Sequence, residues 1–355
     1  MRPIRRTFMT IAVIGSVIAT LFAAGPAAQA AGSPRGMISA GLSIPPVSVA
    51  PGGGAQAAGP PCRPGLGRAN RTDLCWPGFW TLNIYIRGEG LVGQIHFTTV
   101  QYMHLNVIGR AWTEDITITS VTDSGTVPSY VLMSVSAYCG SPCRATVHFP
   151  QNFVAVGTAG TISYYDSIGY GKMHSTKTNY TFDFTLPPGW ESLGPIKSKT
   201  PIAYRCDDML SVIRDGKVTG QGAGCIFPAY TPVLTTMTKL PNIAKNIRNI
   251  QTKGPGHYGR YGSGHPLHRL VNQSQQNKNY RAVCARRVTG PPPKPHLSCD
   301  EYPFQSTREG GTALSKKNRG WAWVPTSEQN AQGGYIIGFY NANRVLNGDA
   351  FWVEV

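Results

Sequence analysis

Acidic side chains are scarce in this chain, which has 17 aspartates and glutamates against 33 lysines and arginines in 355 residues. Long apolar runs are equally scarce: beyond residue 30, no stretch approaches the ~20 apolar residues that a membrane-spanning helix needs. We therefore expect a mature protein without a membrane span. The length is enough for two domains.

The first 30 residues have the order of a secretory signal peptide. A basic start (MRPIRRTFM) precedes an apolar run (IAVIGSVIATLFAAG), and Ala28-Gln29-Ala30 is a small-x-small cleavage pattern. Arg5-Arg6 followed by Thr-Phe-Met is similar to a twin-arginine signal, and a Sec signal with two arginines is the alternative. Both predict a bacterial protein that is secreted to the extracellular space.

The eight cysteines contain no second closely spaced pair beside Cys139 and Cys143, which argues against a zinc site. Zinc stays the alternative, but in an exported protein cysteines are expected to form disulfides. Eight cysteines allow 105 pairings. We favour the sequential pattern: Cys62–Cys75, Cys139–Cys143, Cys206–Cys225 and Cys284–Cys299.

The positive charge is concentrated in the second half of the chain. From residue 201 onward there are 19 lysines and arginines and nine aspartates and glutamates. Such an excess in one part suggests a polyanionic partner there, such as nucleic acid. A basic surface that only maintains solubility is the alternative.

Residues 31–60 are rich in glycine, proline, alanine and serine, so we expect a flexible segment. Residues 61–195 alternate apolar and polar side chains, as at Leu82, Ile84 and Ile86. About seven short strands with turn signals between them predict an all-β, sandwich-like domain. No catalytic constellation stands out there, so this domain is expected to bind a cell-surface or glycan ligand, or to act as a spacer.

Residues 200–355 mix helix and strand signals. Isoleucines at 243, 247 and 250 predict a helix that begins near Pro241 and stops at Gly254. Residues 254–280 are expected to be mainly loop.

Short strands are predicted around the Pro291–Pro293 run, at Cys284–Val288 and at His296–Cys299. Further strands are expected at 320–325 and 351–355. A helix between the last two would have Ser327 as its N-cap.

The few acids of this part cluster at two places that suit phosphodiester hydrolysis. Asp300 and Glu301 directly follow Cys299, and Glu328 stands at the predicted helix start. The reaction needs a base for water and a divalent cation for the phosphate, and Mg²⁺ typically takes one or two carboxylates. Alternatively, the paired acids lie on the surface and Glu328 stabilises a helix N-terminus.

Two runs of sequence resemble the NucA/NucB family of secreted bacterial deoxyribonucleases. They are CDEYPF at 299–304, followed by Ser306-Thr307 and Glu309-Gly310-Gly311, and PTSEQNAQGG at 325–334. Shorter matches, such as Arg205-Cys206-Asp207, extend the resemblance to about residue 200. The all-β part lies outside it.

The resemblance implies a small α+β domain with a ββα-metal nuclease core. It assigns the general base to Asp300 and a supporting role to Glu301. It also implies that Glu328 binds one divalent cation, Mg²⁺ or Mn²⁺, with Asn330 as a second metal-side group. The family pattern has an acid followed directly by asparagine, whereas Gln329 intervenes here. Counting back from Gly333-Gly334 places Glu328 at the acid position.

We therefore expect a monomeric, secreted, metal-dependent DNA endonuclease without strong sequence specificity that degrades extracellular DNA. One alternative is a nuclease effector with an N-terminal delivery module, and another is a non-catalytic binder of DNA and a surface. The side chains expected to contact the DNA backbone are Lys245, Arg248, Arg286, Arg287 and Arg308.

Overall fold

The structure is a computed structural model that describes residues 35–49, 66–215 and 217–355. The predicted signal peptide and Cys62 lie outside the described residues. Within them, every helix is too short or too polar to cross a membrane.

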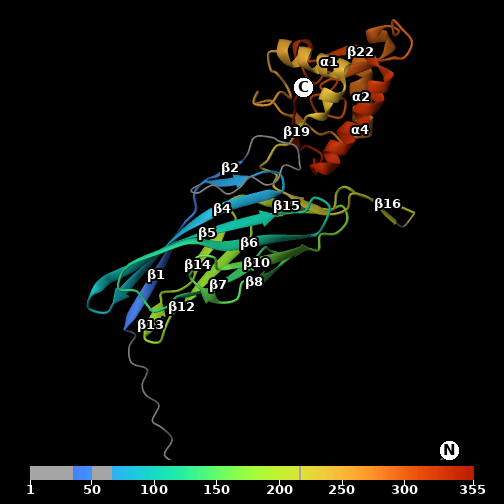
Figure 1. The fold of residues 1–355 in the computed structure, drawn as a ribbon. Helices are drawn as coiled ribbons and strands as arrows, with labels where there is room; N and C mark the ends of the chain where they lie inside the picture. Colours follow the sequence, from blue (N-terminus) through green and yellow to red (C-terminus); the bar gives the residue numbers. More distant parts are fainter. Residues whose placement is uncertain (1–34, 50–65, 216) are drawn as a thin grey trace, which may run out of the picture. The chain divides into compact units, whose positions relative to one another are not determined.

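A large, mainly antiparallel sheet forms the centre of the all-β part, and β4, β5 and β6 run side by side in it (Figure 1). The predicted alternation is confirmed on β4, where Leu82 and Ile84 are buried and Asn83 and Tyr85 are partly exposed. The sheet contains β1 (Gly36–Ser43), β2 (Val47–Val49), β3 (Gly67–Ala69), β4 (Asp73–Ile86), β5 (Gly90–His104), β6 (Ala111–Gly125), β8 (Cys143–His148), β10 (Ala159–Asp166) and β13 (Trp190–Ser192).

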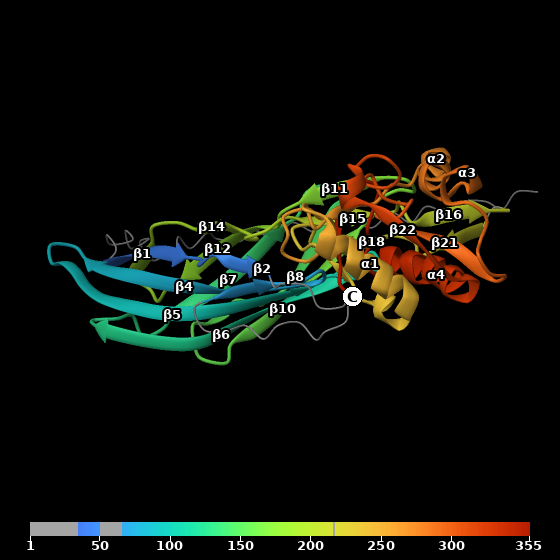
Figure 2. The same cartoon turned by 90° about the horizontal axis from the view of Figure 1, so that it is seen from above.

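A second sheet shares one hydrophobic core with the first (Figure 2). Trp80 of the first sheet meets Phe182 of the second edge to face, with ring centroids 4.7 Å apart. Such pairs stabilise beyond the area that they bury. The predicted all-β character is confirmed. The second sheet contains β7 (Leu132–Tyr138), β9 (Asn152–Phe153), β12 (Asn179–Thr185) and β14 (Ile196–Lys199).

The prediction of a flexible segment over residues 31–60 is wrong for Gly36–Ser43 and Val47–Val49, which form β1 and β2. Gly36–Ser43 pairs with β4 along its whole length, and Ile38 is buried in the core. The strand alternates Ile38, Ala40 and Leu42 with glycine and serine, and this pattern was hidden among the glycines, prolines and serines of residues 31–60.

Residues just after 200 pack with the all-β core. Tyr204, Cys206, Cys225 and Phe227 all belong to it, whereas the second core begins at Leu234. The elements here are β11 (Met173–Thr176), β15 (Tyr204–Asp207) and β18 (Gly224–Ile226), which form one sheet, and the hairpin of β16 (Ser211–Arg214) and β17 (Lys217–Gly220). The two cores therefore divide between Phe227 and Leu234, and not near residue 200, where the second domain was predicted to begin.

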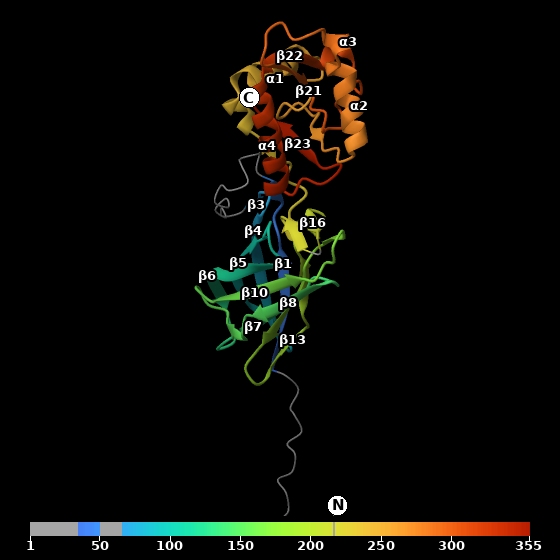
Figure 3. The same cartoon turned by 90° about the vertical axis from the view of Figure 1, so that its right-hand side faces the viewer.

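The second core lies among the helices and short strands of the C-terminal part, where α1, α2 and α4 are drawn around β21 and β22 (Figure 3). Strands β21 and β22 pair antiparallel, and α4 follows β22 directly. The elements are β19 (Val233–Leu234), η1 (Thr236–Lys239), α1 (Pro241–Lys253), β20 (Leu267–His268), α2 (Gln273–Cys284), α3 (Arg286–Thr289), β21 (Leu297–Tyr302), η2 (Lys316–Asn318), β22 (Gly320–Pro325), α4 (Thr326–Ala342) and β23 (Ala350–Val353).

Three local predictions in this part need correction. Residues 273–280 belong to α2 and not to a loop, and Cys284–Val288 is the end of α2 and most of α3 and not a strand. Helix α4 begins at Thr326, so Ser327 is inside it and is not its N-cap. The helix from Pro241 and the strand at Gly320–Pro325 are confirmed.

Three of the predicted disulfides are confirmed: Cys139–Cys143, Cys206–Cys225 and Cys284–Cys299. The last joins the end of α2 to β21 at the position before Asp300. Trp321 and Trp323 of β22 pack against it.

Candidate active site

Asp300 is almost completely enclosed, with 1% of its surface exposed. It lies on β21, opposite Ala322 of β22. Asn246 of α1 donates from Nδ2 to Oδ2 at 2.7 Å, and Gln332 of α4 donates from Nε2 to Oδ1 at 2.7 Å. Asn246 also donates to the Asp300 carbonyl oxygen at 3.0 Å. Two helices therefore fix the carboxyl group without any ion pair among the described residues.

Burial raises the pKa of Asp300 to about 6. The hydrogen bonds from Asn246 and Gln332 oppose this rise because they stabilise the charged carboxylate, and the nearby charge of Glu328 adds to it. A carboxylate with a pKa near neutral pH can exchange protons with water under physiological conditions, as a general base must.

Glu301 is buried too, and it lines a cavity next to Asp300. Its Oε1 accepts a hydrogen bond from the backbone N–H of Gln305 at 3.1 Å, and its Oε2 lies 3.4 Å from Sγ of Cys284. Burial, together with the charge of Asp300, raises the pKa of Glu301 to about 8. The side chain is therefore mainly a neutral carboxylic acid at pH 7.

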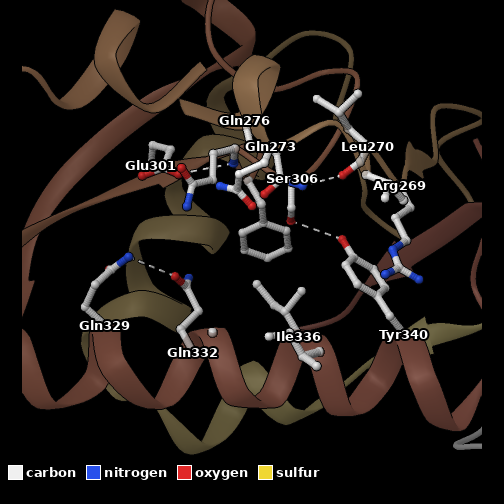
Figure 4. A pocket seen from close by; sticks show the side chains of 15 residues that line it. Arg269, Leu270, Gln273, Gln276, Glu301, Ser306, Gln329, Gln332, Ile336 and Tyr340 are labelled. Atoms are coloured by element: carbon white, nitrogen blue, oxygen red, sulfur yellow. Dashed lines mark hydrogen bonds between the residues drawn. The ribbon is translucent and has the colours of Figure 1, made fainter. Parts of the chain in front are cut away.

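The cavity beside Glu301 has a volume of about 400 Å³ and an unusual number of amide side chains (Figure 4). Gln332 and Gln329 reach into it from α4, and Gln329 donates to Gln332 Oε1 at 3.2 Å. At the other end, the guanidinium of Arg269 lies 4.5 Å from the ring centroid of Tyr340. We call this space the amide cavity; its polar lining includes Arg269, Gln273, Gln276, Glu301, Gln305, Gln329 and Gln332.

Glu328 stabilises a helix N-terminus, as the alternative interpretation of the sequence had it, but the helix is α1 and not its own helix α4. Its Oε2 accepts hydrogen bonds from the backbone N–H groups of Asn242 (3.0 Å) and Ile243 (3.1 Å), and its Oε1 accepts one from Asn242 Nδ2 at 2.6 Å. The acid therefore caps the positive N-terminus of α1. The helix that it caps is the one that carries Asn246.

The donor set at this place fits a hard divalent cation. Asp300 and Glu328 are close enough for their charges to interact, and no lysine or arginine neutralises either one among the described residues. Glu328 offers a carboxylate oxygen, and Mg²⁺ can bind through a single carboxylate and keep its other ligands as water. Asn330 is exposed on the first turns of α4. The described residues contain no group of three or more His, Cys, Asp or Glu side chains that could hold a metal by itself.

The structure distinguishes among the five side chains that were expected to contact DNA. All of them are exposed. Only Lys245 lines a groove that reaches Asn246, a direct partner of Asp300. The others, Arg248, Arg286, Arg287 and Arg308, line neither this groove nor the amide cavity.

The sequence reasoning missed Asn246 and Gln332. Neutral amides carry no charge signal. Their only signal was position: Asn246 lies between Ile243 and Ile247 on the buried side of α1, and Gln332 belongs to the run that resembles a nuclease. A polar side chain on a buried helix face usually has a buried partner.

A buried carboxyl group with a strongly shifted pKa beside a cavity is typical of an enzyme that transfers protons. The comparison with known families agrees with this class. Residues 263–354 match the family described as Deoxyribonuclease NucA/NucB, which confirms the predicted resemblance for this segment. No curated protein and no solved structure was found to match the chain.

Proposed function

We propose that the chain is a secreted, metal-dependent DNA endonuclease whose reaction takes place at Asp300. The observation that supports this most is the placement of Asp300 inside the family-matched segment, buried and held by two amides, with a pKa of about 6. In this proposal β21, β22 and α4 form the ββα core of the nuclease.

Asp300 acts as the general base. Its carboxylate accepts a proton from the water that attacks the scissile phosphate. Asn246 and Gln332 each donate to one oxygen, so they hold the group in one orientation and favour its ionised form. Glu301 supports the site as a neutral acid that fixes the turn after β21 through the Gln305 N–H.

Glu328 and Asn330 would hold one Mg²⁺ or Mn²⁺ ion. When bound, such an ion offsets the negative charge that develops on the phosphate. The carboxylate of Glu328 is anchored to α1 through Asn242 and Ile243. Its Oε2 already accepts two hydrogen bonds, whereas Oε1 accepts one and keeps a lone pair for the cation.

The proposed location is extracellular, where free DNA is the substrate. Three disulfides support an extracellular location, because disulfides form and persist in an oxidising compartment. The all-β part would bind a cell-surface or glycan ligand, and the enzyme would act as a monomer.

The experiment is plasmid nicking by the full chain, with Mg²⁺ or Mn²⁺ and with EDTA. We expect conversion of supercoiled plasmid to the open circle in at least one metal, and none after chelation. A chain that binds the plasmid and leaves it intact in both metals would refute the enzyme proposal. Cleavage that continues in EDTA would refute its metal dependence.

A further inference from the structure

A groove of about 520 Å³ lies between α1 and the segment that leads into β22, and its charged lining residues are all basic. We call it the cationic groove. Lys245 and Lys253 of α1 line one side, and Lys316, Lys317 and Arg319 of the η2 segment line the other.

No ion pair neutralises these five cations among the described residues. The groove therefore concentrates positive charge that repels itself, and an anion bound there would relieve the repulsion. A surface that only maintains solubility would not need to gather five cations around one hollow.

One end of the groove reaches the site of the proposed reaction. Asn246 lines the groove and donates to Asp300, and Asn242 lines the groove and donates to Glu328. Both asparagines lie in the first half of α1, and Lys253 lies at its last residue. The groove thus runs from the two acids along the helix.

From these contacts we infer that the cationic groove holds the phosphate backbone of one DNA strand on one side of the scissile phosphate. Lys245 and Lys253 are eight residues apart, which corresponds to about 12 Å along a helix. The ~3.4 Å axial repeat of one strand is shorter than the distance between its successive phosphates, so a stretch of this length accommodates about two phosphates. The inference rests on the proposed nuclease function, and it names the surface through which that site takes its substrate.

Salt dependence of binding tests this inference without any cleavage. We would measure the anisotropy of a short fluorescein-labelled DNA duplex with the full chain in EDTA, over a range of salt concentrations. The variant is Lys253→Gln/Lys316→Gln/Lys317→Gln, three exposed positions of the groove. The matched control is Lys278→Gln/Arg281→Gln/Lys294→Gln, which removes the same charge from exposed positions on α2 and in the loop before β21.

Each phosphate contact contributes about 0.9 to the slope of log K against log salt, so we expect the groove variant to lower the slope by about 2. Its binding at ~0.1 M salt should weaken more than tenfold, and the control should change the slope by less than about 1. Equal slopes for the wild type and the groove variant would overturn the inference. Equal losses in the variant and the control would also overturn it, since binding would then follow net charge.

Heparin in place of DNA completes the test. If the groove variant loses heparin binding but keeps DNA binding, the groove serves another polyanion and the inference is wrong. Failure of this inference differs from failure of the proposed function. A chain that binds DNA through the groove and never cuts it refutes the nuclease alone. A chain that cuts while the groove variant binds normally refutes the groove alone.

Discussion

Gln332 donates a hydrogen bond of 2.7 Å from Nε2 to Oδ1 of Asp300, which joins the helix after the β21–β22 hairpin to the proposed base. Asn246 of α1 donates a hydrogen bond of 2.7 Å from Nδ2 to the other carboxylate oxygen of Asp300, Oδ2. The carboxylate is thereby held between α1 and α4, two helices that lie far apart in the sequence. Several measurable properties depend on this arrangement.

Replacement of Gln332 with leucine should move the acid limb of the pH–rate profile to higher pH. The hydrogen bond from Gln332 lowers the pKa of Asp300, so its removal raises that pKa above about 6, and a base is active only when it is deprotonated. The measurement is kcat/KM for a labelled duplex between pH 5 and 8. Gln273→Leu, which alters the same cavity without touching Asp300, is the control. If the acid limbs of the two pH–rate profiles coincide, Gln332 does not lower the pKa of Asp300.

Glu301→Gln should keep cleavage within a few-fold of the wild type at pH 7. Because burial raises the pKa of Glu301 to about 8, the native side chain is mainly neutral at that pH, and glutamine is its neutral isostere. The unfolded glutamate has an ordinary pKa near 4.5, so the wild type should lose thermal stability relative to the variant as pH rises from about 4.5 to about 8, and the difference should level off above pH 8. A loss of cleavage as large as that of Asp300→Asn would instead assign a charged, catalytic role to Glu301.

Glu328 is expected to have two separable roles. Glu328→Ala removes the cap of α1 and should lower the free energy of unfolding by about 0.5–2 kcal/mol, measured by chemical denaturation. Glu328→Gln keeps an oxygen for the cap, so its stability should stay closer to that of the wild type. If Glu328 also holds the cation, this variant needs at least about tenfold more Mg²⁺ for half-maximal cleavage. A normal Mg²⁺ requirement in Glu328→Gln would leave Glu328 with the capping role alone.

Glu114 in the all-β core should make stability fall as pH rises. The side chain is fully buried, its Oε2 accepts hydrogen bonds from Tyr164 (2.6 Å) and Tyr180 (2.8 Å), and burial raises its pKa to about 7. The folded chain holds this proton more tightly than the unfolded chain, whose glutamate has an ordinary pKa near 4.5. The stabilisation is therefore complete below about pH 4.5 and is lost as pH rises to about 7.

Thermal unfolding between pH 4 and 8 checks the role of Glu114. Glu114→Gln cannot titrate, so this part of the pH dependence should disappear. Glu89→Gln, a change of the same kind at an exposed position, should leave it intact. A Glu114→Gln curve parallel to that of the wild type would show that another group is responsible.

Much of this arrangement could be predicted from local patterns. Alternation at Leu82 and Ile84 predicted a buried strand, and the isoleucine spacing predicted α1, because each element buries one face. Helix α2 was missed because few of its side chains are apolar. Its one clear signal was Asn272, whose side chain caps the helix by accepting from Gln275 N.

At the candidate site, local sequence patterns do not predict which residues are in contact. Asp300 and Glu301 could be chosen from their type and from the family resemblance. The contact between Glu328 and Asn242 joins residues 86 positions apart, and nothing local to either residue predicts it. The same is true of Asn246 and Asp300, which tertiary packing brings together over 54 positions. Neutral amides at a buried site become visible as candidates only when their partners are known.

The central claim is that Asp300 is the base of a nuclease, and the cleavage rate of Asp300→Asn tests it most directly. Single-turnover cleavage of a labelled duplex in Mg²⁺ or Mn²⁺ should slow by roughly 10²–10⁴, the usual contribution of a general base. DNA affinity in EDTA should change little, since Asp300 does not line the cationic groove. A variant that cuts at the wild-type rate would contradict the account.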